Sequence, residues 1–193
     1  VKLETCQECH EGASSVEDLR NVRMQGSLAD YDGDGDVEEG IDSELTGLKE
    51  ILYAAIQEYG ADVAGTPIVY DASSYPYFFD DAGERYGTWT PRLLKAAYNY
   101  QMATKDPGAF AHNAKYMVQL LYDSIADLNE ALGTVDMSTM HRQDPGHFAG
   151  NTEAFRHWDE DGEVQASCAK CHSATGLPEF IHNGTNVANP ISN

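Results

Sequence analysis

The feature that most constrains this chain is a short cysteine motif that occurs twice, near opposite ends of the sequence. One copy reads CQECH and the other reads CAKCH, and together they use all 4 cysteines. The residues concerned are Cys6, Cys9, His10, Cys168, Cys171 and His172. With 7 His among 193 residues, chance would place a histidine directly after both pairs in about one sequence in a thousand. The motif therefore indicates a chemistry that needs this histidine.

Three chemistries use a C-x-x-C pair: a zinc site, a dithiol redox switch, and covalent attachment of haem. Neither of the first two requires the histidine. Two thiols three positions apart on a helical turn can form thioethers to both vinyl groups of one haem, and the next imidazole then faces the iron. We therefore predict two haem c groups with His10 and His172 as proximal ligands, and no disulfides. A zinc site shared by the four cysteines is the main alternative.

The ligand opposite each iron decides whether the iron is closed or open to substrates. Five further histidines are present, which favours a second histidine at both irons. His112 is the first candidate because it directly precedes a strong helical pattern; His147 and His157, each beside an aromatic residue, are the other two. His141 and His182 are expected to be surface residues.

A second motif, DYDGDGDVEEG, resembles the start of a calcium-binding loop. Asp30, Asp32 and Asp34 occupy positions 1, 3 and 5, and Gly35 occupies the sharp turn at position 6. Position 12 is Ile41, so the loop departs from an EF-hand and needs its bidentate carboxylate from further along. A solvated acidic turn is the alternative. The predicted Ca²⁺ site spans residues 30–44, with candidate ligands Asp30, Asp32, Asp34, Asp36, Glu39 and Glu44, while Glu38 and Asp42 are other possible sources of the bidentate carboxylate.

The remaining pattern predicts a mainly α fold with long irregular loops and little β structure. Apolar residues at helical spacing indicate helices over 43–60, from Pro91 to before Lys105, and over 113–132. Ser43 and Thr90 are the expected N-terminal caps, and Gly60 and Gly133 the expected stops. The aromatic segment 65–89 is expected to be extended or a short hairpin. We expect one haem-organised domain over 1–193, with a helical core over 43–132 and haem motifs at 6–10 and 168–172.

The net charge restricts the classes of partner that the chain can bind. The net charge is -20, which disfavours nucleic acid and anionic lipid, and no apolar run is long enough for a membrane span. The sequence begins VKLET, so we expect a processed mature chain or a fragment. Covalent haem attachment occurs outside the cytoplasm, which predicts an extracytoplasmic location: periplasm, cell surface or beyond.

Several longer phrases resemble the bacterial exported multihaem c-type cytochromes. These phrases are DGDGDVEEGI, TPRLLKAAYNYQ, KDPGAFAHNAKYMVQLLYDSI and EAFRHWDEDGEVQASCAKCHSATGLPEF, and the similarity covers most of residues 27–193. The resemblance implies an exported electron carrier with bis-His haems. Relatives often continue into further C-x-x-C-H motifs, so the chain is a short dihaem member or a fragment. Some surface members polymerise into filaments that share histidines between subunits, so the expected partners are other redox proteins or copies of this chain.

Electron transfer without substrate chemistry is therefore the expected function, and no enzymatic activity is expected. The alternative is a dihaem peroxidase or small-molecule reductase, which needs one open iron and nearby acid–base groups such as Arg142 or Arg156. A third hypothesis is an adhesion module stabilised by zinc and calcium, with no haem.

Overall fold

The structure, a computed structural model, describes residues 3–7, 10–23 and 29–143. By its internal contacts the chain divides into two compact units. The terminal unit comprises Val1–Leu19, Met24–Gly26 and Pro145–Asn193, and the helical unit comprises Arg20–Arg23 and Ser27–Asp144. The expectation of one dihaem domain over 1–193 stays a prediction.

The described part of the terminal unit is made of two short helices. Helix α1 covers Leu3–Gln7, and α2 covers Val16–Arg20, whose last residue already belongs to the helical unit. The side chain of Gln7 donates to the carbonyl of Ala13 over 2.7 Å, which ties α1 to the turn that follows it.

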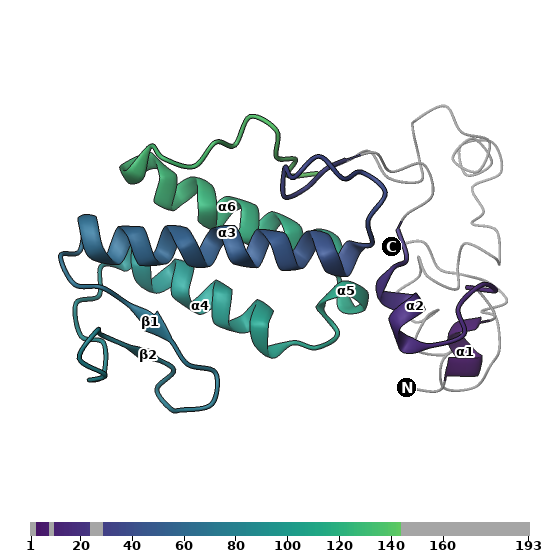
Figure 1. The fold of residues 1–193 in the computed structure, drawn as a ribbon, viewed down its shortest axis with the longest axis horizontal. Helices are drawn as coiled ribbons and strands as arrows, with labels where there is room; N and C mark the ends of the chain where they lie inside the picture. Colours follow the sequence, from purple (N-terminus) through teal and green to yellow (C-terminus); the bar gives the residue numbers. More distant parts are fainter. Residues whose placement is uncertain (1–2, 8–9, 24–28, 144–193) are drawn as a thin grey trace, which may run out of the picture. The chain divides into compact units, whose positions relative to one another are not determined.

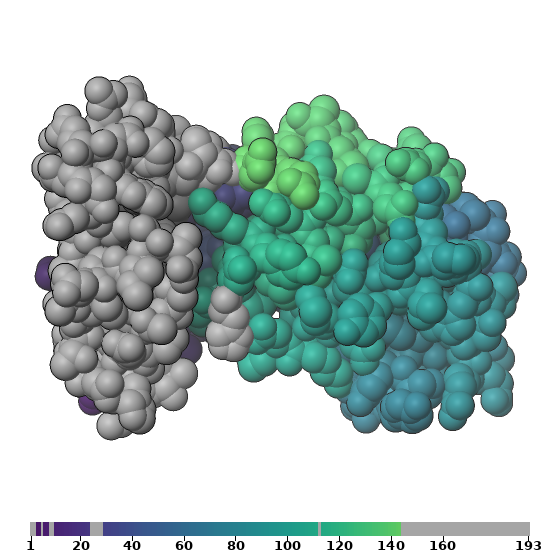
Figure 2. Space-filling model, turned by 180° about the vertical axis from the view of Figure 1, so that it is seen from behind, coloured from purple at the N-terminus to yellow at the C-terminus, as the bar shows by residue number. Residues whose placement is uncertain are grey.

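Three long helices form the helical unit. Helix α3 covers Ile41–Asp62, α4 covers Pro91–Lys105 and α6 covers Ala114–Leu132, while the short α5 covers Ala109–His112. Helices α3, α4 and α6 each pack against the other two, and α3 and α6 make the most extensive contact (Figure 1). The space-filling view shows side chains of these helices meeting in one continuous surface (Figure 2).

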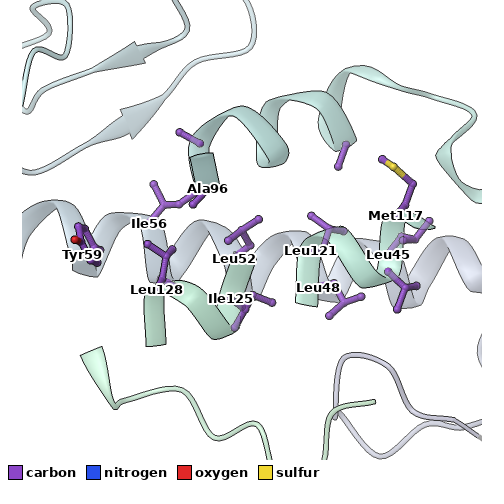
Figure 3. Close-up of a cluster of buried hydrophobic side chains, with 14 of the residues drawn as sticks. Leu45, Leu48, Leu52, Ile56, Tyr59, Ala96, Met117, Leu121, Ile125 and Leu128 are labelled. Atoms are coloured by element: carbon purple, nitrogen blue, oxygen red, sulfur yellow. The ribbon is translucent and has the colours of Figure 1, made fainter. Parts of the chain in front are cut away.

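The core of this unit is the interface between the apolar stripes of the three helices. Leucine and isoleucine side chains of α3 and α6 interdigitate there, with alanines of α4 closing the third side (Figure 3). Each fully buried leucine or isoleucine contributes about 1.5–3 kcal/mol of transfer free energy. The largest apolar side chains that are fully buried in the described part are Leu45, Leu48, Leu52, Ile56, Ile68, Leu93, Val118, Leu121, Ile125 and Leu128.

The start of α4 and both ends of α6 are as expected, and α4 includes Lys105, one residue beyond its predicted end. The hydroxyl of Thr90 accepts from the amide of Leu93 over 3.1 Å at the start of α4, where Pro91 is the first helical residue. Helix α6 is capped by Asn113, and it ends at Gly133, whose φ of 67° lies in the left-handed region that glycine favours.

The predicted ends of α3 were wrong at both termini. The helix begins at Ile41, two residues before Ser43, and the residue at its N-cap position is Gly40. It also continues through Gly60 to Asp62. A Cβ at position 60 would lie 2.7 Å from Cγ2 of Ile68, so this glycine allows the following segment to pack closely on the helix. Its role is close packing rather than termination.

The aromatic segment forms the short hairpin that the sequence predicts. Strands β1 (Val69–Tyr70) and β2 (Phe78–Phe79) pair antiparallel, with Tyr70 opposite Phe78. The rings of these two residues lie 4.9 Å apart, and the Phe78 ring lies 5.7 Å from that of Trp89. The aromatic side chains therefore pack mainly on one another and on α3 and α4.

The described residues confirm a mainly helical fold with little β structure. The organisation of that fold around haem stays a prediction. Among the helices of the described part, none has the length and apolar character needed to cross a membrane.

Candidate functional site

The acidic segment before α3, residues 29–40, forms a tight loop that we call the acidic loop. The two oxygens of Asp30 accept from the backbone amides of Gly33, over 2.6 Å, and Gly35, over 2.8 Å. Both glycines have positive φ, 83° and 96°, a conformation that side chains with a Cβ rarely adopt. The first carboxylate and the two glycines therefore fold the loop back on itself.

The later carboxylates repeat one local hydrogen bond. Asp32 accepts from the amide of Asp34 over 3.1 Å, and Asp34 accepts from that of Asp36 over 2.7 Å. Asp36 accepts from Glu38 in the same way over 2.9 Å. Such bonds, to the amide two residues ahead, are turns that aspartate favours in loops. They leave the remaining oxygens of the carboxylates available to a ligand.

Glu44, in the first turn of α3, holds the acidic loop through hydrogen bonds to the loop's backbone. Its side chain is fully buried, and Oε2 accepts from the amides of Tyr31, over 2.7 Å, and Asp32, over 3.2 Å. Its Oε1 lies 2.5 Å from Nη1 of Arg23. The same guanidinium group donates to the carbonyl oxygens of Ala29 and Glu39. Glu44 and Arg23 thus join the two ends of the acidic loop to the helix.

Within the described ranges, two groups of carboxylates are close enough to share a cation, and both contain Asp32. One is Asp30, Asp32 and Glu44, and the other is Asp32, Asp34 and Glu39; within each group the oxygens lie within 4.8 Å of one another. A groove of about 490 Å³ runs along this face of the loop and over α3. Its acidic lining residues are Asp32, Asp34, Glu39, Asp42 and Glu50.

In the group of Asp32, Asp34 and Glu39, nearby positive charges and hydrogen bonds do not fully compensate the negative charges of the carboxylates. Burial and the neighbouring carboxylates raise the pKa of Asp32 to about 6 from an ordinary 3.8. The same causes, with burial the larger, raise the pKa of Glu39 to about 7 from an ordinary 4.5. The Oε1 atom of Glu39 is buried and has no hydrogen-bond partner among the described residues. Oxygen atoms in this state suit a hard cation such as Ca²⁺.

A segment from the far side of the helical unit lies against the same loop. We call residues 137–142, which follow α6, the anchor segment. The Nδ1 atom of His141 lies 2.8 Å from the carbonyl oxygen of Asp30, and the hydroxyl of Thr139 lies 3.3 Å from that of Gly33. Met140, between them, is only 6% exposed. Figure 1 shows the chain after α6 returning to the loop that precedes α3.

The first C-x-x-C-H motif is described in part. Cys6 is a free, half-buried thiol in α1, and the amide of His10 donates to the carbonyl of Cys6 over 2.9 Å. This hydrogen bond joins residues four positions apart, the spacing of an α-helical hydrogen bond. His10 is exposed. The two described residues of the motif are therefore both at least partly accessible to solvent.

The structure brings some of the predicted ligands together and not others. Asp30, Asp32, Asp34, Glu39 and Glu44 meet in the two carboxylate groups, whereas the exposed Asp36 belongs to neither. His112 is the last residue of α5. The predicted residues Cys9, His147, His157, Cys168, Cys171 and His172 lie outside the described residues.

Three residues of this site carried no signal in the sequence. Arg23 pairs with Glu44, and Gly47 lies so close to Asp32 that a Cβ there would overlap its Oδ2 atom. His141 is exposed, as expected of a surface residue, and it also bonds to a residue 111 positions away. Only the fold brings these residues to the loop, because none of them belongs to a local motif.

Comparison with protein-family models, with curated proteins and with solved structures found no match to this chain.

Proposed function

We propose that the chain is an electron-transfer protein with two covalently attached haem c groups. The observation that carries this proposal is the repeated C-x-x-C-H motif, which accounts for every cysteine and places a histidine after each pair. The described residues support it, because the amide of His10 donates to the carbonyl of Cys6, a hydrogen bond with α-helical spacing. Attached haem supplies a one-electron redox centre.

The residues of the chain would hold each haem and keep its iron closed. His10 and His172 are the proximal ligands in this proposal, and the distal ligands come from His112, His147 and His157. Two imidazoles at each iron leave no position for a substrate, so the protein passes electrons without making or breaking bonds. Donors and acceptors are other redox proteins or further copies of the chain, in an extracytoplasmic compartment.

The alternative, a peroxidase or reductase with one open iron, needs a free acid–base group near that iron. Arg142 was one candidate for this role. Its guanidinium group is held by the carboxylate of Asp123 through two contacts of 2.6 and 2.8 Å. This engagement favours the electron carrier over the enzyme.

We also propose that the acidic loop holds a structural Ca²⁺ ion. The support is the convergence of carboxylate oxygens, the raised pKa values of Asp32 and Glu39, and the buried oxygen of Glu39 that has no described partner. The coordinating oxygens in this proposal come from Asp30, Asp32, Asp34 and Glu39. Glu44 supports these ligands, because the Arg23 guanidinium already compensates its charge and its Oε2 accepts from two loop amides.

The pyridine haemochrome assay tests the central claim. We expect two haems per chain that stay attached after denaturation and extraction with acid acetone. Fewer than two would contradict the dihaem proposal, and tightly bound zinc without haem would support the adhesion-module hypothesis. Electron paramagnetic resonance then separates carrier from enzyme: we expect low-spin ferric haem, and a dominant high-spin signal in the native protein would contradict the closed-iron proposal.

A further inference from the structure

The anchor segment contacts the acidic loop through the loop's backbone rather than through its carboxylates. A carbonyl oxygen can only accept, so the 2.8 Å contact means that Nδ1 of His141 carries the proton and donates it to Asp30. The hydroxyl of Thr139 donates in the same way to the carbonyl of Gly33. The two carbonyls belong to positions 1 and 4 of the calcium-type loop, and the carboxylate oxygens of Asp30 remain directed inward.

The anchor segment is also closely packed against Gly33 of the acidic loop. A Cβ at Gly33 would lie 2.7 Å from the Thr139 hydroxyl and 3.0 Å from Cγ of Met140. The φ of Gly33 is also positive, so the close approach and the loop conformation both require this glycine. The anchor segment therefore fits the acidic loop only while the loop keeps its folded backbone.

Repulsion between the carboxylates of the acidic loop opposes this folded backbone. Within the loop, oxygens of Asp32, Asp34 and Glu39 lie within 4.8 Å of one another, and a cation between them would relieve their mutual repulsion. Asp30 stands at both surfaces, because its carboxylate belongs to a cation-binding group and its carbonyl binds His141. The cation-binding group and the anchor segment therefore share one residue, Asp30, which can couple them.

We propose that Thr139 and His141 are positioning residues of the cation site, and that cation binding and anchoring of residues 137–142 stabilise each other. This inference rests on the calcium proposal above. Thermodynamic linkage requires the effect to be reciprocal: if Ca²⁺ tightens the anchor, the anchor raises the affinity for Ca²⁺ by the same factor. The anchor segment also holds the chain to the helical unit directly before residue 144, where the stretch that carries the second haem motif begins.

The first test measures Ca²⁺ affinity by titration calorimetry on the full chain as isolated, at pH 8. His141→Leu removes the donor to Asp30, and we expect Ca²⁺ binding about five-fold weaker at unchanged stoichiometry. His141→Asn places an amide N–H where Nδ1 lies and is expected to restore most of that affinity. Thr139→Val is expected to weaken binding about three-fold, because its contact is longer. Ser138→Ala is the matched control, since Ser138 bonds to Asp136 and not to the loop.

The second test follows tryptic cleavage after Arg142, the last residue of the anchor segment, by mass spectrometry. We expect cleavage there to be about ten-fold faster in chelator than in 1 mM Ca²⁺, because the anchor opens more often. Cleavage after Lys95, within α4, requires global unfolding, which Ca²⁺ also slows because it stabilises the native state. In His141→Leu we expect Ca²⁺ still to protect Lys95 but to protect Arg142 much less than in the wild-type chain.

The outcomes separate the two proposals. If the wild-type chain does not bind Ca²⁺, the calcium proposal fails and this inference fails with it. If it binds Ca²⁺ but His141→Leu binds equally well, or if cleavage at Arg142 does not respond to Ca²⁺, the linkage is wrong and the calcium proposal stands. Equal protection of Arg142 by Ca²⁺ in His141→Leu and in the wild-type chain also contradicts the linkage, because it shows that Ca²⁺ acts through the stability of the whole unit rather than through the anchor.

Discussion

Arg23 and Glu44 form an ion pair that is almost closed to water. Nη1 and Oε1 lie 2.5 Å apart, with the two side chains 12% and 0% exposed. A buried pair of this kind is costly to desolvate and adds little net stability, but removing one partner leaves the other charge uncompensated. The pair therefore fixes the geometry of the acidic loop more than it raises the stability of the fold.

Glu44→Ala tests this role. The substitution leaves the Arg23 guanidinium and the amides of Tyr31 and Asp32 without their acceptor, so we expect a loss of about 3 kcal/mol in the free energy of unfolding. Urea denaturation followed by circular dichroism measures this loss. Glu130→Ala is the matched control, because Glu130 pairs with Arg92 at an exposed position and its loss is expected to cost about 0–1 kcal/mol. Equal effects of the two substitutions would contradict the bracing role.

Gly47→Ala should impair the cation site without harming the helix. Alanine favours a helix interior over glycine by about 1 kcal/mol, yet its Cβ would overlap Oδ2 of Asp32. Asp32 must then move away from Asp34 and Glu39. We expect Ca²⁺ affinity to fall at least about ten-fold, since one carboxylate ligand is displaced. Titration calorimetry measures the affinity.

Gly87→Ala provides the control for that substitution. A Cβ at Gly87 would meet no atom within 4 Å, so both stability and Ca²⁺ affinity are expected to stay near those of the wild-type chain. Unchanged Ca²⁺ binding by Gly47→Ala would mean that Asp32 is not a ligand.

Most of the helix ends could be predicted from the sequence, because each depends on only a few neighbouring residues. Thr90 followed by Pro91, and Gly133 after an apolar stripe, mark helix ends through bonds and conformations of a few neighbouring residues. Gly60 failed as a stop for the opposite reason. Its significance depends on Ile68, which the hairpin brings against the helix, and no local pattern reports that contact.

In the candidate site, too, the local features could be predicted from the sequence and the long-range contacts could not. The alternating aspartates of the acidic loop were visible because calcium loops space their ligands two residues apart. The partners that shape the loop were not visible, because Arg23 reaches Glu44 from 21 positions away and His141 reaches Asp30 from 111 positions away. Buried charge pairs and hydrogen bonds to backbone carbonyls depend on tertiary structure, so a single sequence does not encode them in any readable spacing.

The raised pKa values predict an unusual dependence of stability on pH in the chelator-treated protein. Asp32 and Glu39 titrate near 6 and 7 when folded, but near 3.8 and 4.5 when unfolded. Between about pH 4 and pH 7 the native state therefore binds more protons than the unfolded state, and stability falls as pH rises. At full value the two shifts would correspond to about 6 kcal/mol. Because both carboxylates are partly open to solvent, which screens their interactions, we expect a loss on the order of 2 kcal/mol across this window.

Urea denaturation at pH 5, 6, 7 and 8, with chelator and with 1 mM Ca²⁺, measures this dependence. Ca²⁺ is expected to remove most of the loss at pH 8, because the cation compensates the ionised carboxylates. The lowered pKa values of Asp71 and Asp136, caused by hydrogen bonds from Ser73 and Ser138, act in the opposite direction but below about pH 4. A chelator-treated protein that becomes more stable from pH 5 to pH 8 would contradict the prediction.

Paired cysteine substitutions distinguish the two main chemistries of the C-x-x-C-H motifs. In the dihaem proposal each motif binds its own haem, so Cys6→Ser with Cys9→Ser is expected to halve the covalent haem, and Cys168→Ser with Cys171→Ser is expected to halve it equally. A zinc site built from all four cysteines predicts a different result, because losing either pair destroys the whole site. The pyridine haemochrome assay and metal analysis on the two double variants, expressed with the haem-attachment machinery, measure both quantities. One remaining haem in each variant supports independent attachment, and loss of all bound metal from both would overturn it.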